Sequence, residues 1–153
     1  RIVIDSRGRT PPSARTLVPC DPPSIVATTE RISRAKRRAL EETGAEVLSL
    51  ASTTGKVDLA ELCAVLGGRE VTSLLVEGGG GLAAAFLEAG LVDRAWFIVA
   101  PTIIGGDEAP TAVRGSGVES VSEAWRLQKV ETRKLGDDFA IGGLIPGSVL
   151  LDI

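Results

Sequence analysis

The amino-acid sequence predicts an α/β fold with a mostly parallel central sheet, helices on both faces of that sheet and an antiparallel hairpin at the C-terminal end. Apolar runs of strand length alternate with helix-like segments over residues 2–100, which is typical of a parallel sheet covered by helices. Hydrophobic residues make up 44% of the chain and aromatic residues only 3%, which indicates an aliphatic interior. A length of 153 residues suits one domain, so we expect a single domain over residues 1–153.

The first predicted strand, residues 2–4, is short and ends in a polar loop. Residues 5–12 contain Asp, Ser and Gly followed by two prolines, and such a segment cannot continue a hydrogen-bonded ladder. Ser6, Arg7 and Arg9 of this loop could contact a phosphate group. Taken alone, they are better explained as a solvated basic turn.

The second predicted strand, residues 24–28, is followed by a helix. Thr29 is the expected N-cap of this helix, which runs to about Glu42 and stops at Gly44. Its many basic residues are best explained as the exposed face of a helix that covers a sheet. Residues 46–50 then form the third predicted strand.

The next helix begins at Asp58, which forms an acidic variant of the capping box with Glu61. The helix stops at the glycine pair of residues 67–68. Cys63 lies on the apolar stripe of this helix, so we expect an inert thiol in the core.

A strand, a glycine turn and a helix follow at residues 71–89, and the candidate site lies here. Residues 71–76 have the length and the continuous apolar character of a buried central strand. Glu77 follows at the carboxyl end of that strand, where open α/β sheets place their ligands. Four glycines lead into a helix over residues 82–89 that has no side-chain N-cap and is closed by Gly90. Free N–H groups at a helix start favour an anion, usually phosphate.

Two other interpretations of the glycine turn remain open. Close packing of a helix against a sheet also requires glycines after a strand. The segment also satisfies the dinucleotide-binding pattern G-x-G-x-x-A through Gly78, Gly80 and Ala83. However, the next predicted strand, residues 95–100, ends in Pro101 rather than in the acidic residue that binds a ribose hydroxyl.

The last third of the chain changes character. Residues 109–122 are rich in Gly, Ser and Val and are expected to form a loop. Two strand-like segments follow, residues 125–134 and 139–146, and the connecting residues 135–138 contain Gly and Asp. This spacing predicts an antiparallel hairpin at the edge of the sheet.

Composition excludes several classes of function. A net charge of −3 leaves no broad basic surface for nucleic acid. The chain contains no histidine, which excludes Ser-His, Cys-His and zinc-deaminase chemistry within it, and no metal site is predicted. No apolar run reaches the roughly 18 residues of a membrane helix. Cys20 and Cys63 form no redox motif, so we expect a reducing cytoplasm.

Several blocks of the sequence, taken in order, resemble one family. They are Asp5-Ser6-Arg7, Arg9-Thr10-Pro11-Pro12, Val76-Glu77-Gly78-Gly79, the helix over residues 82–89, Gly90-Leu91-Val92-Asp93, Ala100-Pro101-Thr102-Ile103-Ile104-Gly105-Gly106 and Leu135-Gly136-Asp137-Asp138. The family is the C-terminal reductase domain of the bifunctional bacterial riboflavin-biosynthesis deaminase/reductase. The resemblance covers nearly the whole chain.

The resemblance implies a three-layer dihydrofolate-reductase-like fold, NADPH as the cofactor and a homodimer. The family reduces 5-amino-6-(5-phosphoribosylamino)uracil by hydride transfer to the sugar's C1, with the sugar opened as an imine. By position, Glu77 would contact this phosphorylated pyrimidine substrate and Ser6 would contact the cofactor. The residues expected along the NADPH phosphates are Gly79, Gly80, Gly81, Leu82, Ala83, Ala84 and Ala85. No catalytic residue is assigned.

The chain departs from the family pattern in three ways. Gly80-Gly81 stands where the family usually has a small residue or proline followed by threonine, and a common lysine is Thr102 here. By the resemblance, we expect the N-terminal half of the reductase domain to be missing, and the chain has no methionine and starts in a strand-like run. We therefore expect an N-terminally truncated domain that holds only part of an active site.

Two other functions are also compatible with the sequence. One is another pteridine- or folate-type reductase on the same fold, which a comparison of the ribosylaminopyrimidine phosphate with dihydrofolate would separate. The other is a non-catalytic module that binds a nucleotide or phosphosugar, which would bind without turnover.

Overall fold

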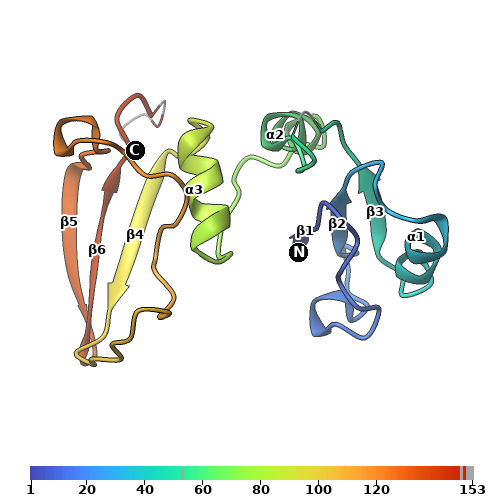
Figure 1. Cartoon of the computed structure of the whole chain (residues 1–153), viewed down its shortest axis with the longest axis horizontal. Coiled ribbons are helices and arrows are strands. Elements are labelled where there is room, and N and C mark those ends of the chain that lie inside the picture. The colour runs from blue at the N-terminus through green and yellow to red at the C-terminus, as the bar shows by residue number, and fades with distance from the viewer. Residues whose placement is uncertain (53, 149, 151–153) are drawn as a thin grey trace. The chain divides into compact units, whose positions relative to one another are not determined.

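The computed structural model describes residues 1–52, 54–148 and 150, which belong to two units, Arg1–Ser73 and Leu74–Ile153 (Figure 1). The first unit contains β1 (Ile2–Ile4), the short 3-10 helix η1 (Arg15–Leu17), β2 (Ile25–Thr28), α1 (Arg34–Glu41), β3 (Glu46–Ser49) and α2 (Leu59–Gly67). The second contains α3 (Gly80–Glu88), β4 (Arg94–Val99), the 3-10 helix η2 (Val121–Glu123), β5 (Gln128–Leu135) and β6 (Asp138–Leu144).

The first unit is a three-stranded parallel sheet in the order β1-β2-β3, with a helix on each face (Figure 1). Alternate residues of the strands point to opposite faces. One face packs against Leu40 of α1 through Val26 and Val47, and the other packs against α2 through Ala27 and other side chains. Burial of both faces explains why β1 is apolar throughout and why the middle residues of β2 and β3 are apolar.

Both α-helices of the first unit, α1 and α2, have a side-chain N-cap. Asp58 accepts a hydrogen bond from the Glu61 backbone N–H at 3.0 Å, as the capping pattern predicts. The Glu61 side chain does not complete the box, because it accepts instead from the Ala51 backbone N–H at 2.5 Å. It thereby connects the start of α2 to the end of the preceding strand. Cys63 is half-buried, and burial raises the pKa of its thiol.

The predicted N-cap of α1, Thr29, was wrong, because the helix begins later in the chain. Ser33, not Thr29, caps the helix, and its hydroxyl accepts from the Lys36 backbone N–H at 3.2 Å. Thr29 is buried, and its hydroxyl donates to the Ser6 carbonyl oxygen at 2.8 Å. The same hydroxyl accepts from the Arg31 backbone N–H at 3.2 Å, and the Thr29 carbonyl oxygen accepts from the Ile32 N–H at 3.2 Å, so Thr29 opens a turn that precedes the helix rather than the helix itself. The stop at Gly44 is confirmed, with φ at 88°.

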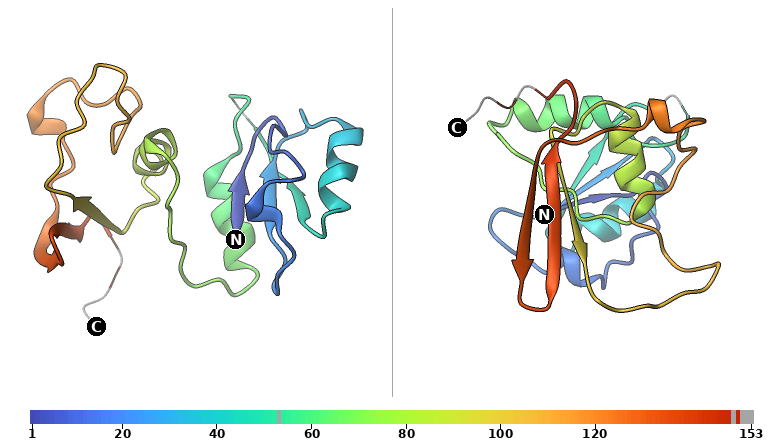
Figure 2. Two further views of the ribbon diagram at one scale, coloured as in Figure 1. Left: turned by 90° about the horizontal axis from the view of Figure 1, so that it is seen from below. Right: turned by 90° about the vertical axis from the view of Figure 1, so that its left-hand side faces the viewer.

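The second unit is built on a three-stranded antiparallel sheet in the order β4-β6-β5, which both figures show side by side (Figures 1 and 2). The predicted hairpin is confirmed: β5 and β6 are joined by Gly136 and Asp137, with Gly136 at φ 65°. Glycine at the first central position is typical of type II′ hairpin turns. β6 is the central strand of this sheet rather than an edge strand, because β4 pairs with its other side.

The Trp96 ring of β4 lies on Gly142 of β6. A Cβ atom at Gly142 would approach the Trp96 ring carbons to 2.5 Å and 2.7 Å, so only glycine fits under the ring. The Arg133 guanidinium stacks on the same ring at 4.9 Å from its centroid.

Residues 71–76 do not form the predicted central strand. They form neither helix nor strand, and Leu75 is 80% exposed. A strand is held by hydrogen bonds to its neighbours, and no described strand pairs with this segment. The apolar sequence therefore meets the compositional requirement of a buried strand without the pairing that a strand needs.

The predicted α/β class, the parallel sheet with helices on both faces and the C-terminal hairpin are confirmed. The parallel and antiparallel strands belong to two separate sheets in the described part of the chain. The expectation of a single domain over residues 1–153 stays a prediction. No helix among the described residues is both long and apolar enough to cross a bilayer.

Candidate functional site

The first turn of α3 exposes backbone N–H groups. Gly79 is the N-cap and provides no side-chain cap, and its carbonyl oxygen accepts from the N–H groups of Leu82 at 2.8 Å and Ala83 at 3.2 Å. The N–H groups of Gly80 and Gly81 have no hydrogen-bond partner among the described residues. Free N–H groups and the positive end of the helix dipole together favour an anion at this point.

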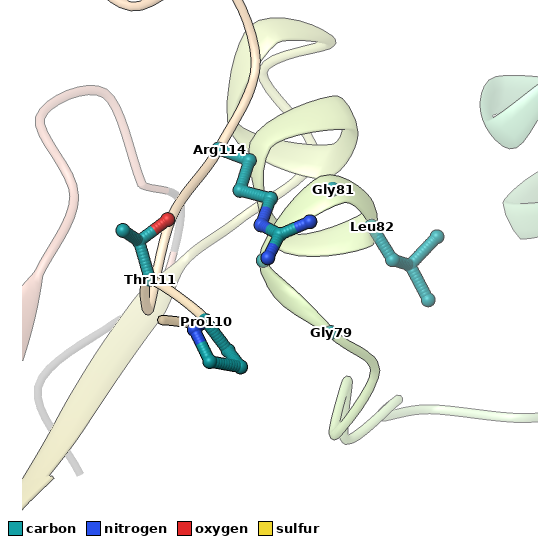
Figure 3. Close-up of a pocket in the computed structure, with 7 residues that line it drawn as sticks. Gly79, Gly81, Leu82, Pro110, Thr111 and Arg114 are labelled. Atoms are coloured by element: carbon teal, nitrogen blue, oxygen red, sulfur yellow. The ribbon is translucent and has the colours of Figure 1, made fainter. Parts of the chain in front are cut away.

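A pocket of about 310 Å³ opens beside these N–H groups within the second unit (Figure 3). Four of its lining residues come from the glycine turn and the start of α3, and three come from a loop about 30 residues later in the chain. The lining residues are Gly79, Gly80, Gly81, Leu82, Pro110, Thr111 and Arg114.

The glycines of the turn have different structural requirements. At Gly80 a Cβ atom would lie 2.5 Å from the Thr111 carbonyl oxygen, and the Gly80 carbonyl oxygen accepts from the Arg114 N–H at 3.0 Å. Glycine at position 80 is therefore required by packing of the loop against the helix. At Gly79 and Gly81 a Cβ atom would meet nothing within 4 Å. These two positions are open toward solvent, which leaves room for a ligand close to the backbone.

Arg114 is the cation of this pocket. Figure 3 shows its side chain beside the first turn of α3. It forms no ion pair among the described residues. A cation near a helix N-terminus is disfavoured by the helix dipole unless an anion lies between them. The exposed N–H groups, the open glycines and the guanidinium thus fit a phosphate group.

Three lining residues, Arg114, Thr111 and Pro110, were not predicted from the sequence. They lie in the segment that was predicted only as a loop, and nothing in their local sequence indicates that the loop returns to α3. The available signal was a lone arginine in a Gly- and Ser-rich loop. Its proximity to the glycine turn is a tertiary fact.

The structure divides the seven residues predicted along the cofactor phosphates into two groups. Gly79, Gly80, Gly81 and Leu82 line the pocket, whereas Ala83, Ala84 and Ala85 do not. Ala84 is buried, and a Cβ atom at Gly115 would lie 2.9 Å from its Cβ atom. Ala84 therefore packs α3 against the loop that contains Gly115 rather than facing a ligand.

Glu77 lies two residues before the N-cap of α3 and is exposed. Its carboxylate makes no hydrogen bond or ion pair with another described residue, and it is not among the residues that line the pocket. An unpaired carboxylate here is free to accept hydrogen bonds from a substrate, and its predicted role stays a prediction.

Ser6 belongs to the first unit, at the carboxyl edge of the parallel sheet. Its hydroxyl accepts from the Val57 backbone N–H at 3.0 Å, and its carbonyl oxygen accepts from the Thr29 hydroxyl at 2.8 Å. Ser6 thus joins the connections that follow all three strands. Its predicted contact with a cofactor also stays a prediction.

The loop that contains Ser6 is held in place by Asp5. The Asp5 carboxylate is 7% exposed and accepts from the Thr10 N–H at 2.6 Å, the Thr10 hydroxyl at 2.7 Å and the Arg7 N–H at 3.3 Å. Burial alone would raise the pKa of Asp5, but these hydrogen bonds outweigh it and lower the pKa below its ordinary value.

Comparison with known protein families gives an extended match. The family described as "RibD C-terminal domain" matches residues 1–141. The chain is 34% identical over 152 residues to a protein of Methanothermobacter thermautotrophicus named 2,5-diamino-6-ribosylamino-4(3H)-pyrimidinone 5′-phosphate reductase, covering 96% of this chain and 66% of that protein. It is 32% identical over 141 residues to riboflavin biosynthesis protein RibD of Actinobacillus pleuropneumoniae, covering 92% of this chain and 38% of that protein.

Among solved structures, RibD of Acinetobacter baumannii (form 1) superposes with a TM-score of 0.74 at 25% identity. The superposition covers 97% of this chain and 37% of that protein. The chain thus spans less than two thirds of the length of each of these three proteins.

Proposed function

Because the chain belongs to the RibD C-terminal domain family, we propose that it carries the NADPH-dependent reduction of 5-amino-6-(5-phosphoribosylamino)uracil to the ribitylamino product in riboflavin biosynthesis. The observation that supports the cofactor most directly is the start of α3, where two unpaired N–H groups and Arg114 border one pocket. Phosphate groups are the common ligands of such helix starts.

In this proposal the residues of the pocket bind and orient the cofactor. The N–H groups of Gly80 and Gly81 donate hydrogen bonds to phosphate oxygens, and Arg114 adds a charge-assisted contact. NADPH supplies a hydride when it is bound. The reduction would place that hydride on C1 of the ring-opened ribosyl imine and a proton from solvent on the imine nitrogen, which would give the ribitylamine. Glu77 binds the substrate and stabilises positive charge on the imine.

The diamino substrate of the Methanothermobacter protein is a second candidate. That relative is 34% identical, and its name specifies the 2,5-diamino pyrimidinone rather than the uracil. The two substrates share the ribosylamino group and the 5′-phosphate, so the same chemistry at C1 serves both. Turnover of each compound, followed by loss of NADPH absorbance, decides between them.

The cofactor site is tested by titrating the 153-residue chain with NADPH and following nicotinamide fluorescence. We expect saturable binding. We expect Arg114→Gln to weaken the binding of NADPH and NADH alike by about 10-fold, because it removes a charged contact to phosphates that both nucleotides contain. Arg126→Gln, at an exposed loop arginine, is the matched control and should leave binding unchanged.

Unchanged binding of both nucleotides by the Arg114 variant would remove this pocket from the proposal. Saturable binding without turnover of either pyrimidine would favour the non-catalytic nucleotide-binding module. Turnover of dihydrofolate instead would favour the folate-type reductase.

We further propose a homodimer, on the family resemblance alone, and a cytoplasmic location, because Cys20 and Cys63 form no redox motif. Light scattering coupled to size-exclusion chromatography measures the mass directly. A mass of one chain would contradict the dimer.

A further inference from the structure

The loop that supplies Arg114 to the pocket contacts one face of α3 (Figure 3). That face is formed by Gly80, Ala84 and Glu88, which lie four residues apart on the helix. At its N-terminal end, the Gly80 carbonyl oxygen accepts from the Arg114 backbone N–H at 3.0 Å. This hydrogen bond holds the backbone of Arg114 beside the pocket.

Gly115 makes a second contact between the same loop and α3. A Cβ atom at this position would lie 2.9 Å from the Ala84 Cβ atom and 2.6 Å from the Glu88 Oε1 atom. The flexible Glu88 side chain can move away, but Ala84 is buried in the middle of the helix and cannot. The absence of a side chain at Gly115 therefore determines how closely the loop approaches the helix.

Gly117, two residues later in the loop, provides an internal comparison. Gly115 has φ at 96° and Gly117 has φ at 68°, so both adopt a backbone conformation that favours glycine. A Cβ atom at Gly117 would meet nothing within 4 Å. Both positions therefore resist a side chain through backbone strain, but only Gly115 also needs the space against α3.

We propose that Gly115 is a positioning residue of the pocket: by letting the loop pack on Ala84, it keeps Arg114 where the nucleotide binds. The inference rests on the proposed function, because Arg114 is the cation proposed to contact the cofactor phosphates. A loop that is packed on α3 for only part of the time lowers the apparent affinity in proportion to that fraction. The loss of affinity is therefore limited to what removal of the Arg114 charge itself would cause.

The first test needs no nucleotide and measures hydrogen exchange of the Arg114 backbone amide by NMR in the 153-residue chain. We expect Gly115→Ala to speed this exchange about 5-fold or more, because the hydrogen bond to Gly80 breaks when the loop leaves the helix. Gly117→Ala is the matched control and should leave the exchange unchanged. Ala84→Val enlarges the same contact from the helix side without straining the loop backbone, and should also speed the exchange.

The second test measures the affinities for NADPH and NADH. We expect Gly115→Ala to weaken both, by no more than the loss of about 10-fold expected for Arg114→Gln, and Gly117→Ala to change neither. Gly115→Ala combined with Arg114→Gln should bind no more weakly than Arg114→Gln alone, because one residue acts through the other. Additive losses would overturn the positioning role. Thermal unfolding of each variant confirms that it is folded.

The failures of this inference and of the proposed function differ. Unchanged exchange of the Arg114 amide in folded Gly115→Ala and Ala84→Val variants would overturn the role of Gly115 and leave the cofactor proposal intact. Faster exchange with unchanged affinity for both nucleotides would overturn the role of Gly115 and that of Arg114 together. A folded wild-type chain that binds neither nucleotide would overturn the cofactor of the proposed function, and the effect of Gly115 on affinity with it.

Discussion

The positions of the glycine turn differ in whether packing requires a glycine there. Gly80 is needed because the loop at Thr111 leaves no space for a Cβ atom, whereas Gly79 and Gly81 face open space. The packing interpretation and the ligand interpretation of the motif therefore apply to different positions. Substitutions at Gly80 would mix a folding defect with a binding defect, so charged side chains near the turn give cleaner tests.

Glu77 offers such a test at the residue scale. We expect Glu77→Gln to lower turnover about 10-fold or more while NADPH affinity changes little, because the neutral amide cannot stabilise positive charge on the imine. Steady-state kinetics and a nicotinamide fluorescence titration separate the two effects. Glu119→Gln, at another exposed glutamate, should leave both unchanged. Wild-type turnover in Glu77→Gln would remove this carboxylate from the reaction.

Strands at the edges of the two sheets are protected to different degrees. In the first unit, Arg37 of α1 donates to the Val47 carbonyl oxygen of β3 at 3.0 Å, and Arg69 pairs with Glu46 at 2.7 Å. In the second unit, the edge strand β5 is irregular between Gln128 and Glu131 and carries charged side chains. Arginine contacts, charge and irregular register all discourage pairing with another chain. The opposite edge strand, β4, has no charged side chain and pairs in regular register over its apolar residues Trp96 to Val99.

The loop after β1 is an element whose stability should depend on pH. Because hydrogen bonds lower the pKa of Asp5 in the folded state, its contribution is fully present above the unfolded pKa of about 3.9. It is lost as the pH falls through the lower, folded value. We expect Asp5→Asn to reduce the free energy of unfolding by about 1–3 kcal/mol at neutral pH. Denaturant titrations from pH 7 to pH 3 measure both the loss and its pH dependence.

Comparing Asp5→Asn with wild type at several pH values tests the direction of the Asp5 pKa shift. The difference in stability between wild type and Asp5→Asn should shrink as the solution becomes more acidic. A difference that grows toward low pH would contradict the direction of the shift. Asp137→Asn, at the exposed hairpin turn, serves as the control.

At the scale of the whole molecule, each unit has its own set of buried residues. The first unit buries two hydrophobic clusters, one on each face of its parallel sheet. The second unit buries Ala84, Phe86, Ala140 and Ile145. The apolar segment 71–76 contributes none of its residues to either set.

This distribution predicts a contrast between two leucines. Leu62 is 0% exposed in the core of the first unit, so Leu62→Ala should reduce the free energy of unfolding by about 2–5 kcal/mol. Leu75 is 80% exposed, so Leu75→Ala should change it by less than about 0.5 kcal/mol. Chemical denaturation measures both. A large loss for Leu75→Ala would mean that the segment is buried in solution.

Most elements could be predicted from the sequence because their causes are local. Apolar runs of three residues marked β1 and β2, Val47-Leu48 marked β3, Asp58 marked the start of α2, and the Gly136-Asp137 pair marked the hairpin. The choice between Thr29 and Ser33 as a cap could not be made from residue type, because both are suitable caps, and Thr29 is buried in a turn before the helix, where its hydroxyl contacts Ser6. The same holds for the candidate site: the glycine turn could be predicted from the sequence, and the position of Arg114 could not.

By itself, the sequence determined the α/β class, the family, the position of the glycine turn and the absence of histidine chemistry. Periodicity, caps and turn residues act within a few positions of the chain, so the order of residues suffices to predict them. Only the tertiary structure decided that β4 pairs with β6, that residues 71–76 have no strand partner and that Arg114 lies beside α3. Each of these joins residues far apart in the chain, or depends on a hydrogen-bonding neighbour, and no local pattern records either.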